Sequence, residues 1–417
     1  MNVLGGLIVV LAFCTAALRI VPACRRTGLG RWHPAVAWLA LELVFFGVGS
    51  FVIALEGDPY VAIYVAGAVL LFAWSVSISD GAAHRRAAVP GLPALVVDDP
   101  APVRPIVAGI LAAAGVVAIV PILLRVGIPF LVPDITAARV EIAGPVVQLL
   151  RVAIPGAVLA ALVLFLRRRT PRAGWIAVAL LAAALVFDIA LASRYLAVEL
   201  VAAAVIAAGL AGARLPRAAV IAVGATAVLV FGGIQVLRAY EQAEGHEVMF
   251  GVSRTVERLF IIQPRTLEAL QAEIPAQQPF FGGLTWLRQF GPALGRPDIP
   301  NLGYWIYPRL FPGQEPPGYA APGLIGEAWA NFGVAGLLLF AGLGVAVERA
   351  GALIARRRLA TADIAAAALL VLFIARTHAL GLNGLGVLVV LVVAWRLLVA
   401  RPAGLVDDLV ATLRWRT

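Results

Sequence analysis

Long apolar runs separated by short polar segments dominate the chain. Each run has about the 20 residues that an α-helix needs to cross the hydrocarbon layer of a bilayer. About eleven such runs can be placed, at 2–23, 34–55, 60–79, 105–126, 142–166, 173–191, 195–213, 218–236, 322–347, 361–379 and 382–400. The pattern predicts an all-α, polytopic integral membrane protein.

The arginines predict how these helices cross the membrane. Every second connection between the expected spans carries an arginine cluster, and the clusters lie at 25–31, 85–104, 167–172, 214–217, 356–358 and 401–416. Cytoplasmic loops are enriched in basic residues. We therefore expect the N-terminus outside and the C-terminus in the cytoplasm. All 33 basic residues are Arg, which is typical of a GC-rich bacterial genome. The expected location is the bacterial cytoplasmic membrane.

Composition narrows the possible functions. Of the 417 residues, 62% are hydrophobic and 13% are charged, which excludes a soluble globular protein. The net charge of +10 is explained by arginines in cytoplasmic loops, so nucleic acid is not an expected partner. The chain has no glycine-rich phosphate loop and no His/Cys metal pattern. Neither a metal nor a cofactor is therefore expected.

One long polar segment interrupts the apolar runs and divides the expected architecture. Residues 1–237 are expected to hold eight membrane helices, 238–321 a large extracytoplasmic loop, 322–400 three more helices and 401–417 a cytoplasmic tail. The loop should be helical up to about residue 274, with a new helix after Pro264. Its remainder, rich in Gly, Pro and aromatic residues, should be irregular. A segment of this length in a compact protein is usually functional.

The chain is expected to re-enter the membrane at Pro322, at the start of a span that continues to Val347. Glu327 and Asn331 lie four residues apart, so they share one face of this helix. A carboxylate inside a membrane is costly and is usually functional or paired. Glu327 is therefore either a functional group or a partner of the helix dipole or of a neighbouring cation.

Arginine is also common where the orientation places the outer face, against the usual distribution. These arginines are Arg125, Arg139, Arg151, Arg194, Arg238, Arg254, Arg258, Arg265, Arg288, Arg296, Arg309 and Arg376. Nearby glutamates, Glu141, Glu199, Glu241, Glu244, Glu247 and Glu257, neutralise part of this charge. The excess indicates either a site for an anion such as a phosphate, whose oxygens fit a guanidinium, or a scaffold of ion pairs.

Four stretches resemble the Wzy-type polymerases of bacterial surface polysaccharides, which include the O-antigen polymerases. They are GIPFLVPDITAARVEIAGP (127–145), SRYLAVELVAAAV (193–205), FFGGLTWLRQFGPALGRPDIPNLGYWIYP (280–308) and PGLIGEAWANFGVAG (322–336). The last is similar to the family signature Gly-Glu-x-x-x-Asn-Phe-Gly-x-x-Gly. The large loop departs from the family, which often has Ile-Pro-Arg and Lys-Pro pairs where this chain has IPN and PGQEPP.

The resemblance implies a metal-independent glycosyltransferase of GT-C-like architecture. Such an enzyme transfers a glycan from one polyprenyl pyrophosphate to the non-reducing end of a second lipid-linked repeat unit. The reaction needs a base for the acceptor hydroxyl and a cationic pocket for the pyrophosphate. The base candidates are Glu327, Glu141 and His378, of which His378 has a structural, hydrogen-bonded role as its alternative. The expected substrate-binding residues are Arg139, Arg194, Arg254, Arg258, Arg288, Trp286, Asn331 and Arg376.

The expected partners are polyprenyl-pyrophosphate-linked glycans and membrane lipids, with flippase and chain-length regulator proteins beside the enzyme. Two other functions remain open. One is an O-antigen-ligase-like enzyme or another polyprenyl-phosphate-dependent transferase. The other is a flippase or transporter for lipid-linked glycans. Transporters usually carry charged or broken helices near the membrane midplane. The sequence disfavours transport, because the span centres read as Ala, Val and Leu with the charges at the outer ends.

Overall fold

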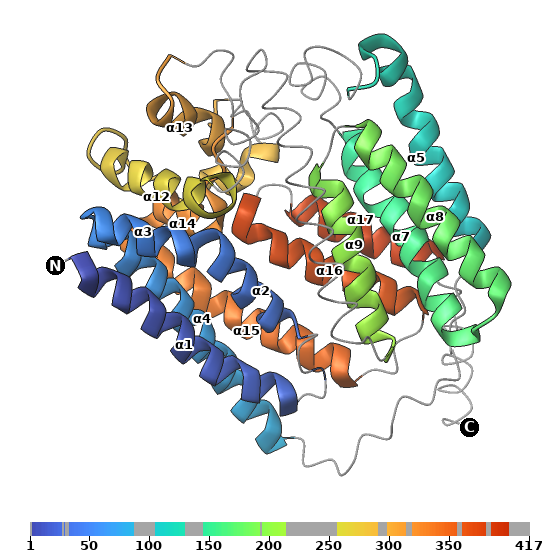
Figure 1. The fold of residues 1–417 in the computed structure, drawn as a ribbon, viewed down its shortest axis with the longest axis horizontal. Coiled ribbons are helices and arrows are strands. Elements are labelled where there is room, and N and C mark those ends of the chain that lie inside the picture. Colours follow the sequence, from blue (N-terminus) through green and yellow to red (C-terminus); the bar gives the residue numbers. More distant parts are fainter. Residues whose placement is uncertain are drawn as a thin grey trace, which may run out of the picture. The chain divides into compact units, whose positions relative to one another are not determined.

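The protein is described by a computed structural model, which covers residues 2–26, 29, 33–86, 105–129, 145–191, 194–213, 257–290, 298–313, 319–356, 361–380 and 385–399. Every regular element in these ranges is a helix (Figure 1). The all-α class expected from the sequence is confirmed for this part of the chain.

Within these ranges, 7 helical segments are long and apolar enough to cross a membrane. They are formed by α1 (Asn2–Arg26), α2 (Pro34–Glu42) with η2 (Leu43–Gly47) and α3 (Val48–Glu56), α4 (Pro59–Arg86), α5 (Pro105–Val126), α7 (Pro145–Arg168), α8 (Pro171–Ala190), and α14 (Gly323–Phe332) with η6 (Gly333–Gly336) and α15 (Leu337–Arg356). The chain is therefore a polytopic membrane protein, as expected.

Shorter apolar helices occupy three more of the expected spans. They are α9 (Arg194–Leu210), α16 (Thr361–Leu380) and α17 (Leu385–Val399). The expected span 218–236 lies outside the described residues. The total of about eleven spans therefore stays a prediction.

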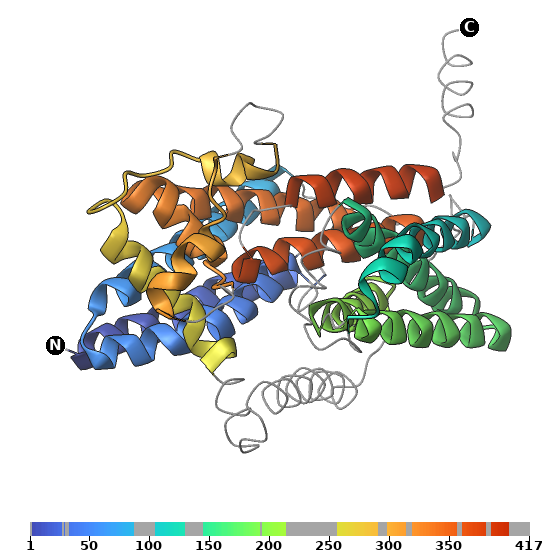
Figure 2. The same ribbon diagram turned by 90° about the horizontal axis from the view of Figure 1, so that it is seen from above.

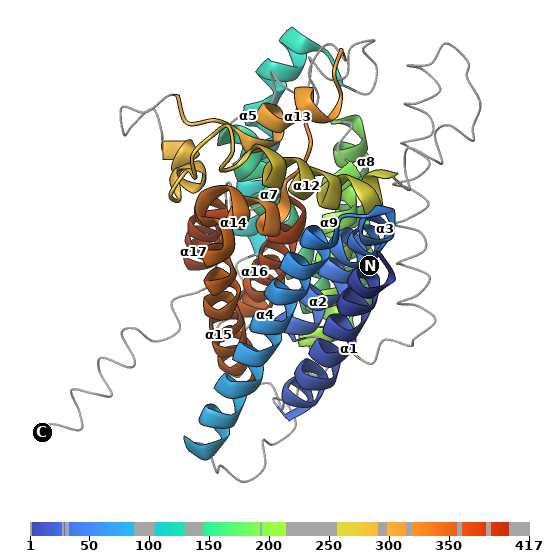
Figure 3. The ribbon, with the colours of Figure 1, turned by 90° about the vertical axis from the view of Figure 1, so that its left-hand side faces the viewer.

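The chain divides into two compact units, and unit 1 comprises Met1–Leu92, Gln235–Arg356 and Ile374–Gly386. Its long helices α1, α2, α4 and α15 pack beside one another (Figure 1). Figure 3 shows α12, α13 and α14 gathered at one end of these helices. The end of α3 lies here too, because its last residue, Glu56, pairs with Arg265 of α12.

An aromatic cluster fills the centre of unit 1. The ring of Trp38 in α2 stacks on Phe72 in α4 at 3.9 Å between centroids, and lies 6.2 Å from Phe340 in α15.

One carboxyl, that of Glu42, lies on the same helix as Trp38 and is fully buried. The expectation that charges occur only at the span ends is therefore wrong. Glu42 was overlooked because a single acidic residue hardly changes the mean hydropathy of a whole span.

His33 begins the second span at the other end of unit 1. Its Nδ1 accepts a hydrogen bond from the backbone N–H of Ala35 at 3.2 Å, which caps α2. Its Nε2 lies 3.3 Å from Oε2 of Glu348 in α15, and both side chains are buried. Gly351 allows this approach, because a Cβ at that position would meet the imidazole ring.

Two glycines on one helix offer a direct test of the packing between α15 and α4. A Cβ on Gly344 would lie 2.5 Å from the carbonyl oxygen of Phe72, whereas a Cβ on Gly342 would meet nothing within 4 Å. We expect Gly344→Ala to lower the free energy of unfolding by about 1–3 kcal/mol through overpacking. Gly342→Ala, the matched control, should raise it slightly because alanine favours the helix. Denaturant titration of the purified protein in detergent measures both. Equal effects would contradict the tight contact.

Four short helices form in the segment expected to be a large loop. They are η3 (Glu257–Ile261), α12 (Ile262–Glu273), η4 (Leu284–Phe290) and α13 (Leu302–Leu310). The helix expected after Pro264 is confirmed as α12, although it begins at Ile262, so that Pro264 lies in its first turn, where a missing N–H costs little. The expected irregularity of 277–322 is wrong for η4 and α13. Asn301 starts α13 by accepting a hydrogen bond from the Gly303 N–H at 3.2 Å.

Ion pairs fasten these short helices together and to α3. Arg265 of α12 pairs with Glu56 of α3 and, at 2.8 Å, with Glu268. Arg309 of α13 pairs with Glu273 of α12 at 2.9 Å. Burial lowers the pKa of Arg265, but its hydrogen bonds and charge interactions with Glu268 and Glu56 outweigh burial and raise that pKa. Of the two roles considered for the outer arginines, an anion site or a scaffold of ion pairs, Arg265 and Arg309 have the second.

Unit 2 comprises Pro93–Ile234, Arg357–Phe373 and Val387–Thr417. Its described helices are α5, α7, α8 and α9 with the first part of α16 and most of α17, and α7 contacts α5, α8 and α9 (Figure 2). Trp395 of α17 packs on Gly156 of α7, where a Cβ would lie 2.5 Å from the indole. Polar contacts join α16 to its neighbours: Arg167 donates to Thr361 at 2.7 Å, and Arg396 to Asp363 at 2.7 Å.

Candidate functional site

The segment that carries Glu327 is a short helix of its own within the expected span from 322 to 347, and the apolar segment Gly323–Ala352 agrees with that span. α14 ends at Phe332, and Gly333 follows with a φ of 57°, a left-handed conformation that suits glycine. The hydroxyl of Tyr64 donates to the Gly333 carbonyl at 3.0 Å. With 20 residues, α15 is about 30 Å long and can cross a membrane alone. Glu327 therefore lies on the short helix that precedes α15, within the apolar segment Gly323–Ala352.

Glu327 is almost completely enclosed on α14. Its side chain is 4% exposed, and Asn331, one turn further on, is 1% exposed. The Nδ2 of Asn331 donates to the backbone oxygen of Glu327 at 2.8 Å, so the two residues do share a helix face. Their environment is part of unit 1, on the end where α12 and α13 lie.

Asn331 also ties α14 to the segment before η4. Its Oδ1 accepts a hydrogen bond from the Gly283 N–H at 2.9 Å, and its Nδ2 donates to Oγ1 of Thr285 at 2.6 Å. Backbone bonds run alongside, from Phe281 N to Ala330 O at 3.1 Å and from Gly282 N to Asn331 O at 3.0 Å. Both Nδ2 protons are thus used within the protein.

Aromatic rings surround this junction. Trp329 donates its indole N–H to the Ile274 carbonyl at 3.1 Å and meets the ring of Tyr64 edge-on at 5.1 Å. Trp286 lies 5.3 Å from Phe332 between ring centroids. The indole N–H of Trp286 is buried and has no hydrogen-bond partner in the described part of the chain. A buried donor without a partner is costly, so this atom is available to a ligand or a water.

These contacts join two of the stretches that carry the family resemblance. Gly283, Thr285 and Trp286 belong to 280–308, and Asn331 and Phe332 belong to 322–336. The two stretches are far apart in sequence yet form one buried junction beside Glu327. The junction offers an indole N–H without a partner in the described ranges and several aromatic rings, a combination that suits a polar ligand with apolar faces.

The other predicted site residues fall in several places. Arg288 lies on η4 with Trp286, Arg258 in η3, and Arg376 and His378 near the end of α16, in the portion belonging to unit 1. Arg194 is the first residue of α9, in unit 2. Arg139, Glu141 and Arg254 lie outside the described residues. Of the predicted set, the structure brings together Glu327, Asn331 and Trp286, with Arg288 on the same helix as Trp286.

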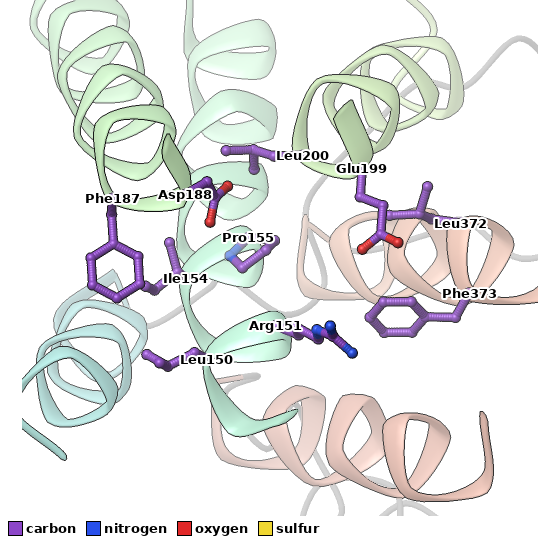
Figure 4. Close-up of a pocket in the computed structure, with 10 residues that line it drawn as sticks. All are labelled: Leu150, Arg151, Ile154, Pro155, Phe187, Asp188, Glu199, Leu200, Leu372 and Phe373. Carbon is purple, nitrogen blue, oxygen red and sulfur yellow. The ribbon is translucent and has the colours of Figure 1, made fainter. Parts of the chain in front are cut away.

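A second group of charged side chains lines a small pocket inside unit 2. Arg151 enters from α7, Asp188 from α8 and Glu199 from α9, with Leu372 and Phe373 of α16 beside them (Figure 4). The space is sufficient for about one water molecule. Asp188 is 6% exposed. A guanidinium flanked by two carboxylates can hold a polar group or water, and it neutralises only part of their charge.

Sequence reasoning missed two residues of these sites. Thr285 gave no signal, because its role depends on a contact with Asn331, 46 positions away. Asp188 gave only a weak sequence signal, because it is an acidic residue near the end of the expected span 173–191. A single ionisable residue in an apolar run is informative in a membrane protein. Arg151 and Glu199 were placed among the outer charges, but their proximity was not predicted.

The fold and the buried polar groups define a polytopic helical membrane protein with a polar junction at one end of a helix bundle. No protein-family model, no curated protein and no solved structure matches the chain.

Proposed function

We propose that the chain polymerises polyprenyl-pyrophosphate-linked oligosaccharide repeat units at the outer face of the cytoplasmic membrane, as Wzy-type polymerases do. One observation carries the proposal. The signature-like stretch 322–336 and the loop stretch 280–308 meet through Asn331, which binds Gly283 and Thr285. Two stretches that resemble one family in sequence thus form one buried junction, and Asn331 at its centre also binds the backbone oxygen of Glu327.

In this proposal Glu327 is the base and Asn331 is a positioning residue. The acceptor hydroxyl oxygen attacks the anomeric carbon of the donor glycan, and its proton passes to the Glu327 carboxylate. The bond from the anomeric carbon to the phosphate oxygen breaks, and the polyprenyl pyrophosphate leaves with the electron pair. Trp286 offers its unused indole N–H to a sugar oxygen, and nearby rings offer stacking surfaces.

The departing pyrophosphate requires cations. We assign this role to the predicted substrate-binding arginines, Arg139, Arg194, Arg254, Arg258, Arg288 and Arg376. Arg265 and Arg309 are excluded, since their guanidinium groups are held by glutamates within unit 1. His378 and Glu141 remain the alternative bases.

The proposal includes about eleven spans with the N-terminus and the segment 238–321 outside. The arrangement of unit 1 supports it. The start of α1 lies by the end of α3, as Gly5 touches Ala54 and Pro59. The end of α3 in turn binds α12 through Glu56 and Arg265. The N-terminus and the described part of 238–321 therefore lie at the same end of the bundle.

Deletion of the coding sequence in the native bacterium, followed by analysis of lipid-linked glycans, tests the function. We expect long polymer to disappear and a single repeat unit on polyprenyl pyrophosphate to accumulate outside the membrane. Complementation with the wild-type chain should restore the polymer. Polymer of unchanged amount and length in the deletion strain would contradict the proposal. Accumulation of full-length polymer on its lipid carrier, without transfer to the final acceptor, would indicate a ligase instead.

A flippase is the second candidate, and interrupted helices favour it. The second span contains the π-helical turn η2, and α14 is separated from α15 by η6. Transporters often bind their substrates where membrane helices are interrupted. The same deletion strain separates the two functions, since loss of a flippase leaves the single repeat unit on the cytoplasmic side. Sensitivity of the accumulated lipid to an enzyme added outside spheroplasts reports the side.

A further inference from the structure

Glu42 lies in the interior of a membrane-crossing segment, where a charged group is costly. It is the last residue of α2, within the span Pro34–Glu56, and its side chain is 0% exposed. The turn that follows it, η2, is π-helical. Such turns widen a helix locally and occur often at functional sites.

Neither carboxyl oxygen of Glu42 has a hydrogen-bond partner among the residues that the structure describes. The same helical segment carries two further buried polar atoms without partners in that set, Nε1 of Trp38 and Oγ of Ser50. Trp38 lies one turn before Glu42, and Ser50 about two turns after it. Buried polar groups without protein partners commonly bind internal water.

Five described elements pack against this span: α1, α4, α12, α15 and η3, of which η3 carries Glu257 and Arg258. The fully buried polar side chains that they contribute are Tyr64 of α4, Glu348 of α15, and Gln263 and Thr266 of α12, and the buried part of α1 adds Cys24. Tyr64 donates to Gly333, and Glu348 faces His33. His33 precedes Glu42 by nine residues, about 13 Å along the helix.

Glu42 is fully buried, and neither of its oxygens has a hydrogen-bond partner in the described ranges, so its ionised form would be far more costly than the neutral acid. We propose that Glu42 is a proton-binding site within the membrane bundle, a carboxylic acid that exchanges its proton with water along the face marked by Trp38 and Ser50. In the exchange, the acid O–H bond breaks as a water takes the proton, and protonation by hydronium restores it. The site is independent of the proposed glycosyl transfer.

Infrared spectroscopy of the purified full-length protein in lipid nanodiscs tests the site. We expect the wild-type protein at neutral pH to show a carbonyl band of a protonated carboxyl that is lost in Glu42→Gln. The band should persist in Glu268→Gln, a surface control on α12. In D2O the band should shift within hours, because the proton exchanges. Identical spectra for wild type and Glu42→Gln, or a Glu42 band that never shifts in D2O, would overturn the proposal.

A second measurement requires no variant. Dicyclohexylcarbodiimide, an apolar reagent, couples to protonated carboxyls in membrane interiors. We expect one adduct mapped to Glu42 by peptide mass spectrometry, with a yield that falls as the pH is raised. Absence of an adduct at Glu42 at any pH would count against proton exchange. Protection of Glu42 by sodium ions at constant pH would identify a metal cation as the ligand and would overturn the proton assignment.

Discussion

Replacement of Glu327 by glutamine is expected to abolish polymer formation while the protein still folds. Glutamine has almost the same shape as glutamate but cannot accept the acceptor proton. Loss of a general base lowers rates by about 100- to 10,000-fold. The side chain is 4% exposed on α14, so an isosteric change should preserve the packing around it. Polymer length and amount in a complemented deletion strain measure the effect.

Glu268→Gln is the matched control for this experiment. Glu268 lies on α12 in the same unit, and its carboxylate binds Arg265 at 2.8 Å on a partly exposed surface. Its loss should leave polymer formation unchanged, because exposed ion pairs contribute little to stability. A well-expressed Glu327→Gln protein that polymerises at the wild-type rate would remove Glu327 from the mechanism. His378 and Glu141 would then be the remaining bases.

Asn331→Ala is expected to be the most destabilising of the polar substitutions at the junction. The side chain makes bonds to Gly283, Thr285 and Glu327, and it is 1% exposed. Each buried group left without a partner costs about 1–3 kcal/mol. The substitution should also free the segment around Gly283 from α14, since the amide is their main side-chain link.

Denaturant midpoints of the purified protein in detergent measure this loss, and limited proteolysis reports on the freed segment. Asn301→Ala is the control, because Asn301 makes one capping bond at the start of α13 and its loss should cost about 1 kcal/mol. If Asn331→Ala were no more destabilising than Asn301→Ala, Asn331 would not hold the junction. Cleavage sites confined to α13 in both variants would lead to the same conclusion.

Helix positions in this protein are largely predictable from sequence, because membrane crossing requires long apolar runs. The expected span 105–126 coincides with α5, and 361–379 differs from α16 by one residue. The break at Gly333 could not be predicted in this way. Apolar residues continue through it, and only the local backbone conformation, a φ of 57°, ends α14 there.

The site was predictable only where it depends on local sequence. The shared face of Glu327 and Asn331 follows from their spacing, and the hydrogen bond between them agrees with it. The bonds from Asn331 to Gly283 and Thr285 depend on tertiary packing, which no spacing rule contains. Glu42 was missed for another reason, since averaging over an apolar span removes the signal of one acid.

The cap at the start of α2 restricts the chemistry of one imidazole. Nδ1 of His33 can accept the Ala35 N–H only through its lone pair, so the ring proton must sit on Nε2, toward Glu348. An imidazolium has no lone pair left on either nitrogen. Capping and positive charge therefore exclude each other at His33, so the side chain that starts the second span can do so only as a neutral imidazole of one tautomer.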